Sequence, residues 1–435
     1  MADSNEQIEQ LAINTIRTLA MDAVQAAGSG HPGTPMALAP VGYVLFNEVL
    51  NYDPAMPNWL GRDRFVLSCG HASMLLYGIL HLSGVKQLDA AGKPTSELAV
   101  SLDAIRQFRQ LGSRCPGHPE YRHTSGVETT TGPLGQGISN SVGMAIAADW
   151  LAARLNRPGF DLFGFNVYAI CSDGDLMEGI GSEAASIAGH LKLSNLCWIY
   201  DDNKITIEGE TSLAFSENVA ARFSGYGWNV LEVEDVNDLD SLRGALAFFG
   251  EDTDQPTLII THTVIGYGSP NKADSESAHG APLGEDEVKL TKASYGWPED
   301  EKFRVPDEVL AHFAAGIGAR GSAARGAWEA SFAQYKQKYP EEAAQLKLIL
   351  AGRLPEGWDA DMAEFPADPK GMASRVSSGK VLNQLAKNVP WMLGGSADLS
   401  PSTKSDLTFE GAGEFTAENR GGRNFHFGIR EHAMA

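Results

Sequence analysis

Hydrophobic positions near the start of the chain recur with helical spacing. Over residues 5–27, apolar side chains fall three or four positions apart, and Gly28 follows as a C-terminal cap. Pro35 suits the first turn of a second helix. The apolar run 65–67 comes next and has the length and character of a buried strand. The pattern therefore predicts two helices followed by a strand.

From about residue 166 onward, short apolar runs alternate with segments of helical character. The clearest helix is the Ala-rich segment 178–191. The runs that predict buried strands are 166–171, 196–200, 228–233 and 257–261. Strands that alternate with helices imply a parallel sheet flanked by helices, with right-handed crossovers. The predicted fold class is α/β.

The pattern changes after residue 320. The stretch that follows is rich in Ala, Glu and Lys and then in Pro, which indicates a helical linker ending near Gly371. A new α/β unit is predicted to begin there, with a helix at 376–385 and a strand at 391–393. The predicted organisation is a first domain, a linker and the incomplete start of a second, similar α/β domain: 1–320, 321–370 and 371–435.

The composition narrows the classes of partner. Of 435 residues, 43% are hydrophobic and 20% charged, which is typical of a globular protein. No apolar run reaches the roughly 20 residues that a membrane helix needs, and no signal peptide is visible, so we expect a cytoplasmic protein. The net charge of −21 disfavours nucleic acid and anionic membranes as partners. A phosphorylated ligand would need local cations, His or Arg side chains, or helix N-termini.

Two polar motifs follow consecutive predicted strands. Asp173 and Gly174 come after the first strand, and Asn203 comes after the next, thirty residues later. An Asp-Gly pair alone is more often a simple turn. Parallel pairing, however, brings both motifs to the same carboxyl edge, where α/β proteins bind ligands. Mg²⁺ or Ca²⁺ takes oxygen ligands, which Asp173, Asn203 and the Ile205 carbonyl can supply. The helix that starts near Glu178 offers N–H groups to a phosphate.

Glycine and histidine recur together in the predicted loops. The segment Thr131-Gly132-Pro133-Leu134-Gly135-Gln136-Gly137 leads into an amphipathic helix, and its glycines would let main chain lie against a flat ring. A helix-capping turn explains this segment about as well. Five histidines lie in Gly- or Pro-containing contexts or nearby: His31, His71, His118, His262 and His279. We expect His262, inside a strand, to be an ordinary loop or core histidine and not a catalytic one. The other four suit proton transfer near neutral pH.

Taken together, these blocks resemble the transketolase family of thiamine-diphosphate enzymes. Ser-Gly-His-Pro-Gly, Cys-Gly-His, Pro-Gly-His-Pro-Glu, Thr-Gly-Pro-Leu-Gly-Gln-Gly, Asp-Gly-Asp-Leu-Met-Glu-Gly, Asp-Asp-Asn and His-Gly-Ala-Pro-Leu-Gly occur in the family's order. The resemblance runs from about residue 10 to the last residue. It implies transfer of a two-carbon ketol unit from a ketose phosphate to an aldose phosphate, with thiamine diphosphate and Mg²⁺ or Ca²⁺ as cofactors. Ser172 stands where the family motif usually has Gly.

The resemblance also assigns roles to single residues. It implies that His31, His71, His118 and His279 line the funnel to the thiazolium ring. His71 and His279 would also touch the diphosphate, and His118 the hydroxyls of the donor sugar. Gly132 and Leu134 would contact the aminopyrimidine. The residues implied to bind the cofactor are His71, Gly132, Leu134, Asp173, Gly174, Glu178, Asn203, His279 and Glu431; those implied to bind the sugar phosphate are His31, His118, His279, Arg375 and Ser402.

The resemblance gives a catalytic role to a residue near the end of the chain. Glu431, in Gly-Ile-Arg-Glu-His, matches the glutamate that hydrogen-bonds the aminopyrimidine, so we expect it to be buried. Without that context, a Glu among helix-forming residues is normally on the surface. Arg375 and Ser402 match the family's grip on the sugar phosphate. The family also implies a homodimer with shared active sites, and a complete member continues beyond the position of Ala435.

Three hypotheses stay open at this point. The first is a transketolase. The second is a catalytically incompetent portion of such an enzyme that only binds the cofactor. The third keeps the chemistry and changes the substrates, as in dihydroxyacetone synthase or phosphoketolase.

Overall fold

The computed structural model describes residues 2–251 and 254–435. It divides into two compact units. The first combines Met1–Ala145 with Phe165–Ala327, and the second combines Ile146–Gly164 with Trp328–Ala435. These units are defined by which residues pack together. The predicted boundaries at 320 and 370 divide the chain into functional domains instead, and they stay a prediction.

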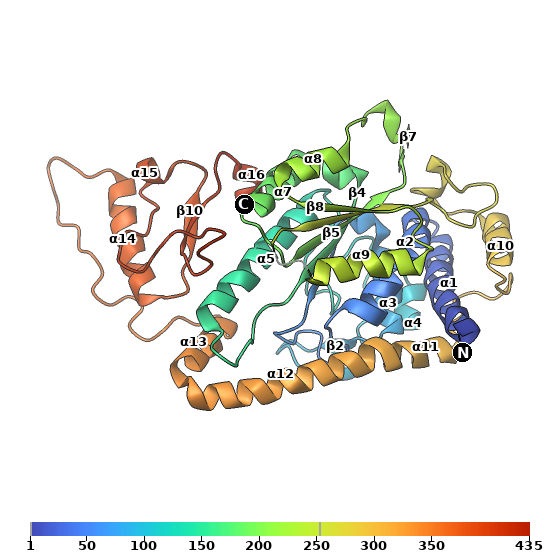
Figure 1. Ribbon diagram of the computed structural model, residues 1–435, viewed down its shortest axis with the longest axis horizontal. Helices are drawn as coiled ribbons and strands as arrows, with labels where there is room; N and C mark the ends of the chain where they lie inside the picture. Colours follow the sequence, from blue (N-terminus) through green and yellow to red (C-terminus); the bar gives the residue numbers. More distant parts are fainter. Residues whose placement is uncertain (1, 252–253) are drawn as a thin grey trace. The chain divides into compact units, whose positions relative to one another are not determined.

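A parallel sheet forms the centre of the first unit (Figure 1). In the described part of the chain its strand order is β1-β4-β5-β9-β8, and every neighbouring pair is parallel. The strands are β1 (Arg64–Leu67), β4 (Val167–Ser172), β5 (Leu196–Asp202), β8 (Asn229–Val233) and β9 (Thr257–His262). All five predicted strands of this region are confirmed to within two residues at each end, as is the α/β fold class.

Helices cover both faces of this sheet. The inward side chains of alternate strand positions, such as Phe65 and Ile199, pack with α1 (Ala2–Ala27), α2 (Gly33–Val44), α3 (Ser73–Leu82) and α9 (Leu239–Glu251). On the other face Trp198 donates its indole N–H to Ser141 of α5 (Gln136–Leu155) at 2.9 Å. Helices α7 (Gly179–His190) and α8 (Val219–Tyr226) also lie on that face (Figure 1). Burial on both faces explains why β4 and β5 read as continuous apolar runs.

The two N-terminal helices form as predicted. The first ends at Ala27, and Gly28 adopts a left-handed φ of +62° there, which a C-terminal cap requires. The second begins at Gly33, where a Cβ would lie 2.4 Å from the carbonyl oxygen of Ala278. Glycine at this position lets the loop before α2 lie directly against the long loop 266–284.

The shorter elements of the first unit connect the strands and helices. They are η1 (Leu45–Val49), η2 (Gly70–Ala72), β2 (Lys86–Leu88), β3 (Pro94–Leu98), α4 (Leu102–Arg106), α6 (Asp173–Met177), β6 (Ile205–Thr206), β7 (Gly209–Glu210), η3 (Thr211–Leu213), η4 (Glu276–Ala278), α10 (Glu285–Ser294), α11 (Asp307–Phe313) and η5 (Ala314–Gly318). The helix α12 (Ala319–Lys338) runs from this unit into the second.

The second unit contains α13 (Pro340–Leu350), α14 (Ser374–Asn388), α15 (Ser400–Thr403), α16 (Glu431–Met434) and a parallel pair of strands. The pair is β10 (Gly394–Ser396) with β11 (Asn424–His426). The prediction of a strand at 391–393 was therefore wrong. Met392 N–H closes a turn onto the Val389 carbonyl, and the strand begins with two glycines instead. A Cβ at Gly395 would lie 2.1 Å from the Phe425 oxygen, so close strand approach outweighs the low strand propensity of glycine.

Among the described residues, no helix is both long enough and apolar enough to cross a membrane.

Candidate active site

Four histidines from separate loops of the first unit meet in one cluster. The ring of His31 lies 5.1 Å from that of His71, 6.5 Å from that of His118 and 5.8 Å from that of His279, measured between centroids. His71 and His279 stack at 5.3 Å. More than 240 positions of sequence separate the first from the last. The fold thus joins the four histidines that the sequence singled out and leaves His262 apart from them.

Burial keeps these four imidazoles neutral at physiological pH. It lowers the pKa of His71 to about 3 and that of His31 to about 4, and the neighbouring histidines add to the effect. The pKa values of His118 and His279 are also lowered, mainly by burial. Neutral imidazoles offer one N–H and one lone pair each. In the free protein the cluster therefore offers hydrogen bonds rather than positive charge.

Buried polar atoms in this cluster have no protein partner. Nδ1 of His31, Nδ1 of His279 and the hydroxyl of Thr131 are buried without a hydrogen bond to any described residue. A native protein rarely leaves such groups unsatisfied. A polar ligand that reaches the cluster would supply the missing partners, which is the first sign that these residues fit a bound group.

A positively charged side chain, Arg109, lies next to the histidine cluster, and the sequence did not predict it. Arg109 has a left-handed φ of +62° and donates a hydrogen bond to the Ser29 hydroxyl at 2.6 Å. Its charge contributes to the lowered pKa values of His31 and His118. An arginine in a polar loop is usually solvated, so no signal in the sequence marks it.

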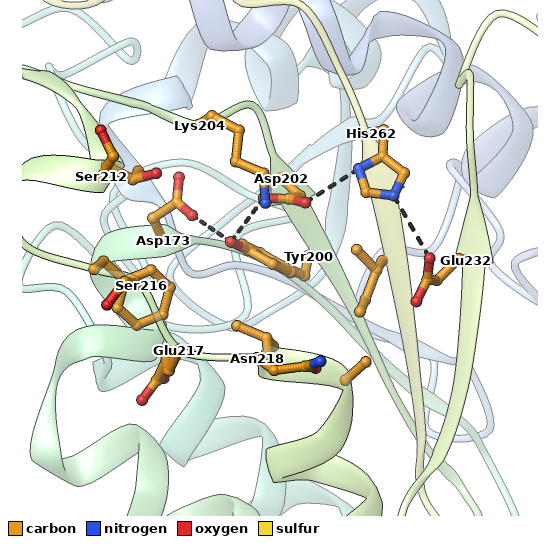
Figure 2. Close-up of a pocket in the computed structure, with 15 residues that line it drawn as sticks. Asp173, Tyr200, Asp202, Lys204, Ser212, Ser216, Glu217, Asn218, Glu232 and His262 are labelled. Carbon is orange, nitrogen blue, oxygen red and sulfur yellow. Dashed lines mark hydrogen bonds and ion pairs between the residues drawn. The ribbon is translucent and has the colours of Figure 1, made fainter.

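The carboxyl edge of β4 and β5 carries the two predicted metal motifs. Ser172 pairs with Asp201 in the parallel register, so Asp173 and Asn203 follow neighbouring strands at the same edge. The hydroxyl of Tyr200 donates to the carboxylates of both Asp173 and Asp202 (Figure 2). The predicted placement at one edge is confirmed. The hydrogen-bonding role of Tyr200 was missed, because a tyrosine in an apolar strand reads as core.

Acidic groups are concentrated at this edge with little exposure to solvent. Asp173 is 3% exposed and Asp201 is fully buried. Burial raises the pKa of Asp173 to about 6 and that of Asp201 to about 7, and each carboxyl is also affected by its acidic neighbours. A divalent cation would stabilise the ionised carboxylates here. The donor set of carboxylate, amide and carbonyl oxygens fits such a cation.

The turn after β5 fixes the predicted amide ligand. Lys204 has a left-handed φ of +62°, and this turn lets the Asn203 side-chain oxygen accept from the Ile205 N–H at 2.9 Å. The Asn203 amide nitrogen donates to Asp201 at 2.8 Å. The amide oxygen keeps a second lone pair, so the orientation is compatible with a metal ligand.

Asp175, which has no predicted role, connects three of the loops that carry the glycine, histidine and metal motifs. Its fully buried carboxylate accepts from the Ser68 hydroxyl at 2.6 Å, the Gly135 N–H at 2.8 Å and the Ser172 N–H at 2.9 Å. Ser68 in turn accepts from the Ile138 N–H at 3.0 Å. The signal that could have found it is the Ser-x-x-Asp spacing, which resembles a capping box.

The glycines of the motifs allow the loops to touch. A Cβ on Gly174 would lie 2.6 Å from the end of the Leu134 side chain. A Cβ on Gly132, which has a φ of +140°, would lie 3.2 Å from the His118 ring. A Cβ on Gly135 would lie 3.0 Å from the Glu178 side chain. In each of these three pairs the loops lie in close contact, with little room for added atoms.

A cavity of about 460 Å³ opens beside the metal motifs. Asp173, Tyr200, Asp202, Glu232 and His262 contribute to its lining (Figure 2). His262, for which we expect an ordinary loop or core role, is partly exposed here. It is the last residue of β9, about a third of its side chain is exposed, and its Nδ1 lies 3.1 Å from Asp202. The strand ends at this point, so the side chain reaches the cavity instead of the core.

The remaining predicted residues belong to the second unit. Glu431 is the first residue of α16, and Arg375 and Ser402 lie in α14 and α15. All three are exposed in the described chain. The expected burial of Glu431 is therefore absent from the single chain, since α16 presents it to solvent.

Comparison with known proteins places this geometry in a family. The family described as "Transketolase, thiamine diphosphate binding domain" matches residues 8–355. A transketolase of Geobacillus stearothermophilus is 53% identical over 427 residues, covering 98% of this chain and 62% of its own length. A transketolase of Bacillus subtilis is 50% identical over 431 residues, covering 99% of this chain and 62% of its own length.

Solved structures agree with these relatives. Transketolase from Leishmania mexicana superposes with a TM-score of 0.92 at 42% identity, covering 98% of this chain and 61% of that one. A transketolase of Pichia stipitis in complex with sedoheptulose 7-phosphate gives 0.91 at 43% identity, with the same coverage. The chain thus spans about three fifths of the length of the proteins it matches. It belongs to the transketolase family and contains that family's thiamine diphosphate binding domain.

Proposed function

We propose that this chain takes part in a transketolase reaction, in which a two-carbon ketol unit passes from a ketose phosphate to an aldose phosphate. The observation that carries the proposal is the meeting of His31, His71, His118 and His279 in the first unit, together with the acid and amide at one sheet edge. Bound thiamine diphosphate supplies a nucleophilic carbon and an electron sink for such a transfer. The Pichia relative in complex with sedoheptulose 7-phosphate supports sugar phosphates as substrates.

The carboxyl edge of the sheet would hold the cation and the diphosphate. Asp173, Asn203 and the Ile205 carbonyl are the proposed ligands of Mg²⁺ or Ca²⁺. Gly174 and Glu178, at the start of α6 and just before α7, would face the diphosphate. Because the protein carries a net charge of −21, this cation is needed to offset repulsion of the phosphates.

The histidine cluster would bind both the cofactor and the sugar. His71 and His279 would donate to the diphosphate, and the unpaired buried Nδ1 of His279 supports a polar ligand at that position. His31 and His118 would hydrogen-bond the donor sugar and exchange protons with it. Gly132 and Leu134 would lie against the aminopyrimidine.

The second unit would complete the site. We infer that Glu431 hydrogen-bonds the aminopyrimidine and that Arg375 and Ser402 bind the sugar phosphate. A homodimer with shared sites would account for the exposure of Glu431 in the single chain, since a partner subunit would cover it. The segments 1–320, 321–370 and 371–435 are proposed as the diphosphate-binding domain, the linker and the start of the pyrimidine-binding domain. A cytoplasmic location stays a prediction.

An activity assay tests the reaction directly. The chain is incubated with thiamine diphosphate, Mg²⁺, xylulose 5-phosphate and ribose 5-phosphate, and sedoheptulose 7-phosphate is measured. Formation of that product by the wild type, and its loss in Asp173→Ala, is the expected result. Formaldehyde and inorganic phosphate are offered as alternative acceptors, and a preference for either would favour dihydroxyacetone synthase or phosphoketolase.

A second candidate is cofactor binding without turnover by this chain alone. This candidate is favoured because the chain covers only 62% of the length of each of these two relatives. Calorimetric titration with thiamine diphosphate in Mg²⁺ separates the two. Binding without sedoheptulose 7-phosphate supports the second candidate, and absence of binding by the wild type would reject both.

A further inference from the structure

We propose that His262, Glu232 and Glu234 form a second metal site, suited to Zn²⁺ or a similar imidazole-binding divalent ion. One ligand atom from each of these side chains lies within 4.8 Å of those of the other two. The site is separate from the proposed Mg²⁺ ligands Asp173, Asn203 and Ile205, and none of the roles described above uses its three residues.

The sheet register places Glu232 and His262 on one face, and Glu234 lies close to both. Glu232 pairs with Ile260 in the parallel ladder of β8 and β9, and Ile260 and His262 point to the same face because they are two positions apart. Glu234 lies just beyond the end of β8, and its carboxylate lies within 4.8 Å of the ligand atoms of the other two side chains. The three groups therefore lie together at the carboxyl edge of two neighbouring strands.

A buried carboxylate orients the histidine for metal binding. Asp202, only 4% exposed, lies with Oδ2 3.1 Å from Nδ1 of His262, and Figure 2 shows this contact on the side away from Glu232. The Asp202 carboxylate is itself held by Tyr200 at 3.0 Å and Lys204 at 2.6 Å. With the proton on Nδ1, the lone pair of Nε2 is directed at Glu232. A carboxylate behind a ligating imidazole is the usual support of a metal-bound histidine.

The spacing between ligand atoms fits a shared ion better than a direct bond. Nε2 of His262 lies 3.8 Å from a Glu232 oxygen, beyond hydrogen-bond distance. Two ligands about 2.1 Å from one tetrahedral ion are roughly 3.4 Å apart. A rotamer adjustment of a few tenths of an ångström would close the difference for this pair. Glu234, whose ligand atom lies within 4.8 Å of the other two, would adjust as well, and both glutamates are exposed.

The chemistry of the donor set selects the type of ion. One imidazole with two carboxylates suits Zn²⁺, Co²⁺ or Mn²⁺, whereas the all-oxygen set at Asp173 suits Mg²⁺ or Ca²⁺. Both Glu232 and His262 line the 460 Å³ cavity. A metal held there by three protein ligands would keep a coordination position open to water or to a small anion in the cavity.

Calorimetric titration with Zn²⁺ tests the site. The chain is stripped of metal with a chelator and titrated in saturating Mg²⁺, so that the oxygen site is filled. One equivalent of Zn²⁺ is expected to bind the wild type. His262→Gln and the double variant Glu232→Gln/Glu234→Gln are expected to lose binding by at least tenfold, and Asp202→Asn to weaken it by about 10- to 100-fold. The matched control is His190→Gln, on the exposed end of α7, which should bind as the wild type does.

Two results would overturn the proposal. Unchanged Zn²⁺ stoichiometry and affinity in His262→Gln would mean that the ion binds elsewhere, for example at the four-histidine cluster. No Zn²⁺ binding by the wild type would mean that His262, Asp202 and Glu232 form only an ion-pair network. Thermal melting of each metal-free variant checks that a loss of binding is not a loss of fold.

Discussion

The two units of the chain present their predicted site residues in contrasting ways. In the first unit, Asp173 is buried, the four histidines are partly buried, and hydrogen bonds and ring contacts from several loops hold them. In the second unit, Glu431, Arg375 and Ser402 lie exposed on short elements or at a helix start. The first set is preorganised within one chain. The second set needs a further surface before it can enclose a ligand.

The difference follows from what each region is built on. Strands β4 and β5 are buried over their whole length, so the residues that follow them have fixed positions. In the described part of the second unit, the sheet is a pair of three-residue strands. A sheet of two short strands supplies little support for a site.

The largest loss of stability is expected for Asp175→Asn. The amide keeps one acceptor oxygen, and its NH₂ group would face the donors Ser68, Gly135 and Ser172. Breaking such a buried network costs about 3 kcal/mol or more of the free energy of unfolding, measured by urea denaturation. Asp359→Asn, on an exposed loop of the second unit, should change it by less than about 0.5 kcal/mol. Equal losses of stability in the two variants would contradict the proposed contrast between a preorganised first unit and a less supported second unit.

A smaller loss is expected for Gly137→Ala. A Cβ there would lie 2.5 Å from Cα of Ser68, a backbone atom that cannot move aside easily. The resulting strain costs about 1–3 kcal/mol. The matched control is Gly143→Ala on the same helix, where nothing lies within 4 Å of the added Cβ. There, higher helix propensity should stabilise the protein by up to about 1 kcal/mol. If the thermal denaturation curves of both variants shift in the same direction, the close contact between Gly137 and Ser68 does not determine the stability of the protein.

The first unit is expected to be sensitive to acid because of His71. Because burial lowers the pKa of His71 from 6.5 to about 3, the unfolded chain binds a proton between these values and the folded chain does not. His71 therefore lowers the free energy of unfolding as pH falls below 6.5, by about 1.4 kcal/mol per pH unit. His71→Gln cannot take up this proton, so between pH 6.5 and pH 5 it should lose about 2 kcal/mol less than the wild type. Parallel pH profiles of the two proteins would rule out a buried neutral His71.

The sequence predicted the parts of this site that depend on local order and strand alternation. Asp173 and Asn203 could be placed at one sheet edge because their spacing matched one strand-helix-strand unit. The meeting of the four histidines was expected only from the family resemblance. Asp175, Tyr200 and Arg109 were missed because their roles come from contacts between loops distant in sequence. The strand at 391–393 was misplaced because its apolar residues outweighed the glycines that actually pair.

The smallest effect on stability is expected for Glu431→Gln. The side chain is exposed at the start of α16, so its loss should change the free energy of unfolding of the chain by less than about 0.5 kcal/mol. If a partner surface covers Glu431 in the active assembly, the same substitution should still abolish most of the turnover. Denaturation and the sedoheptulose 7-phosphate assay, performed on one preparation, separate these effects. A large loss of stability would mean that Glu431 is already part of a closed site, whereas full activity would remove it from the reaction. Either result would end the distinction drawn between a preorganised first unit and a second unit that needs a partner.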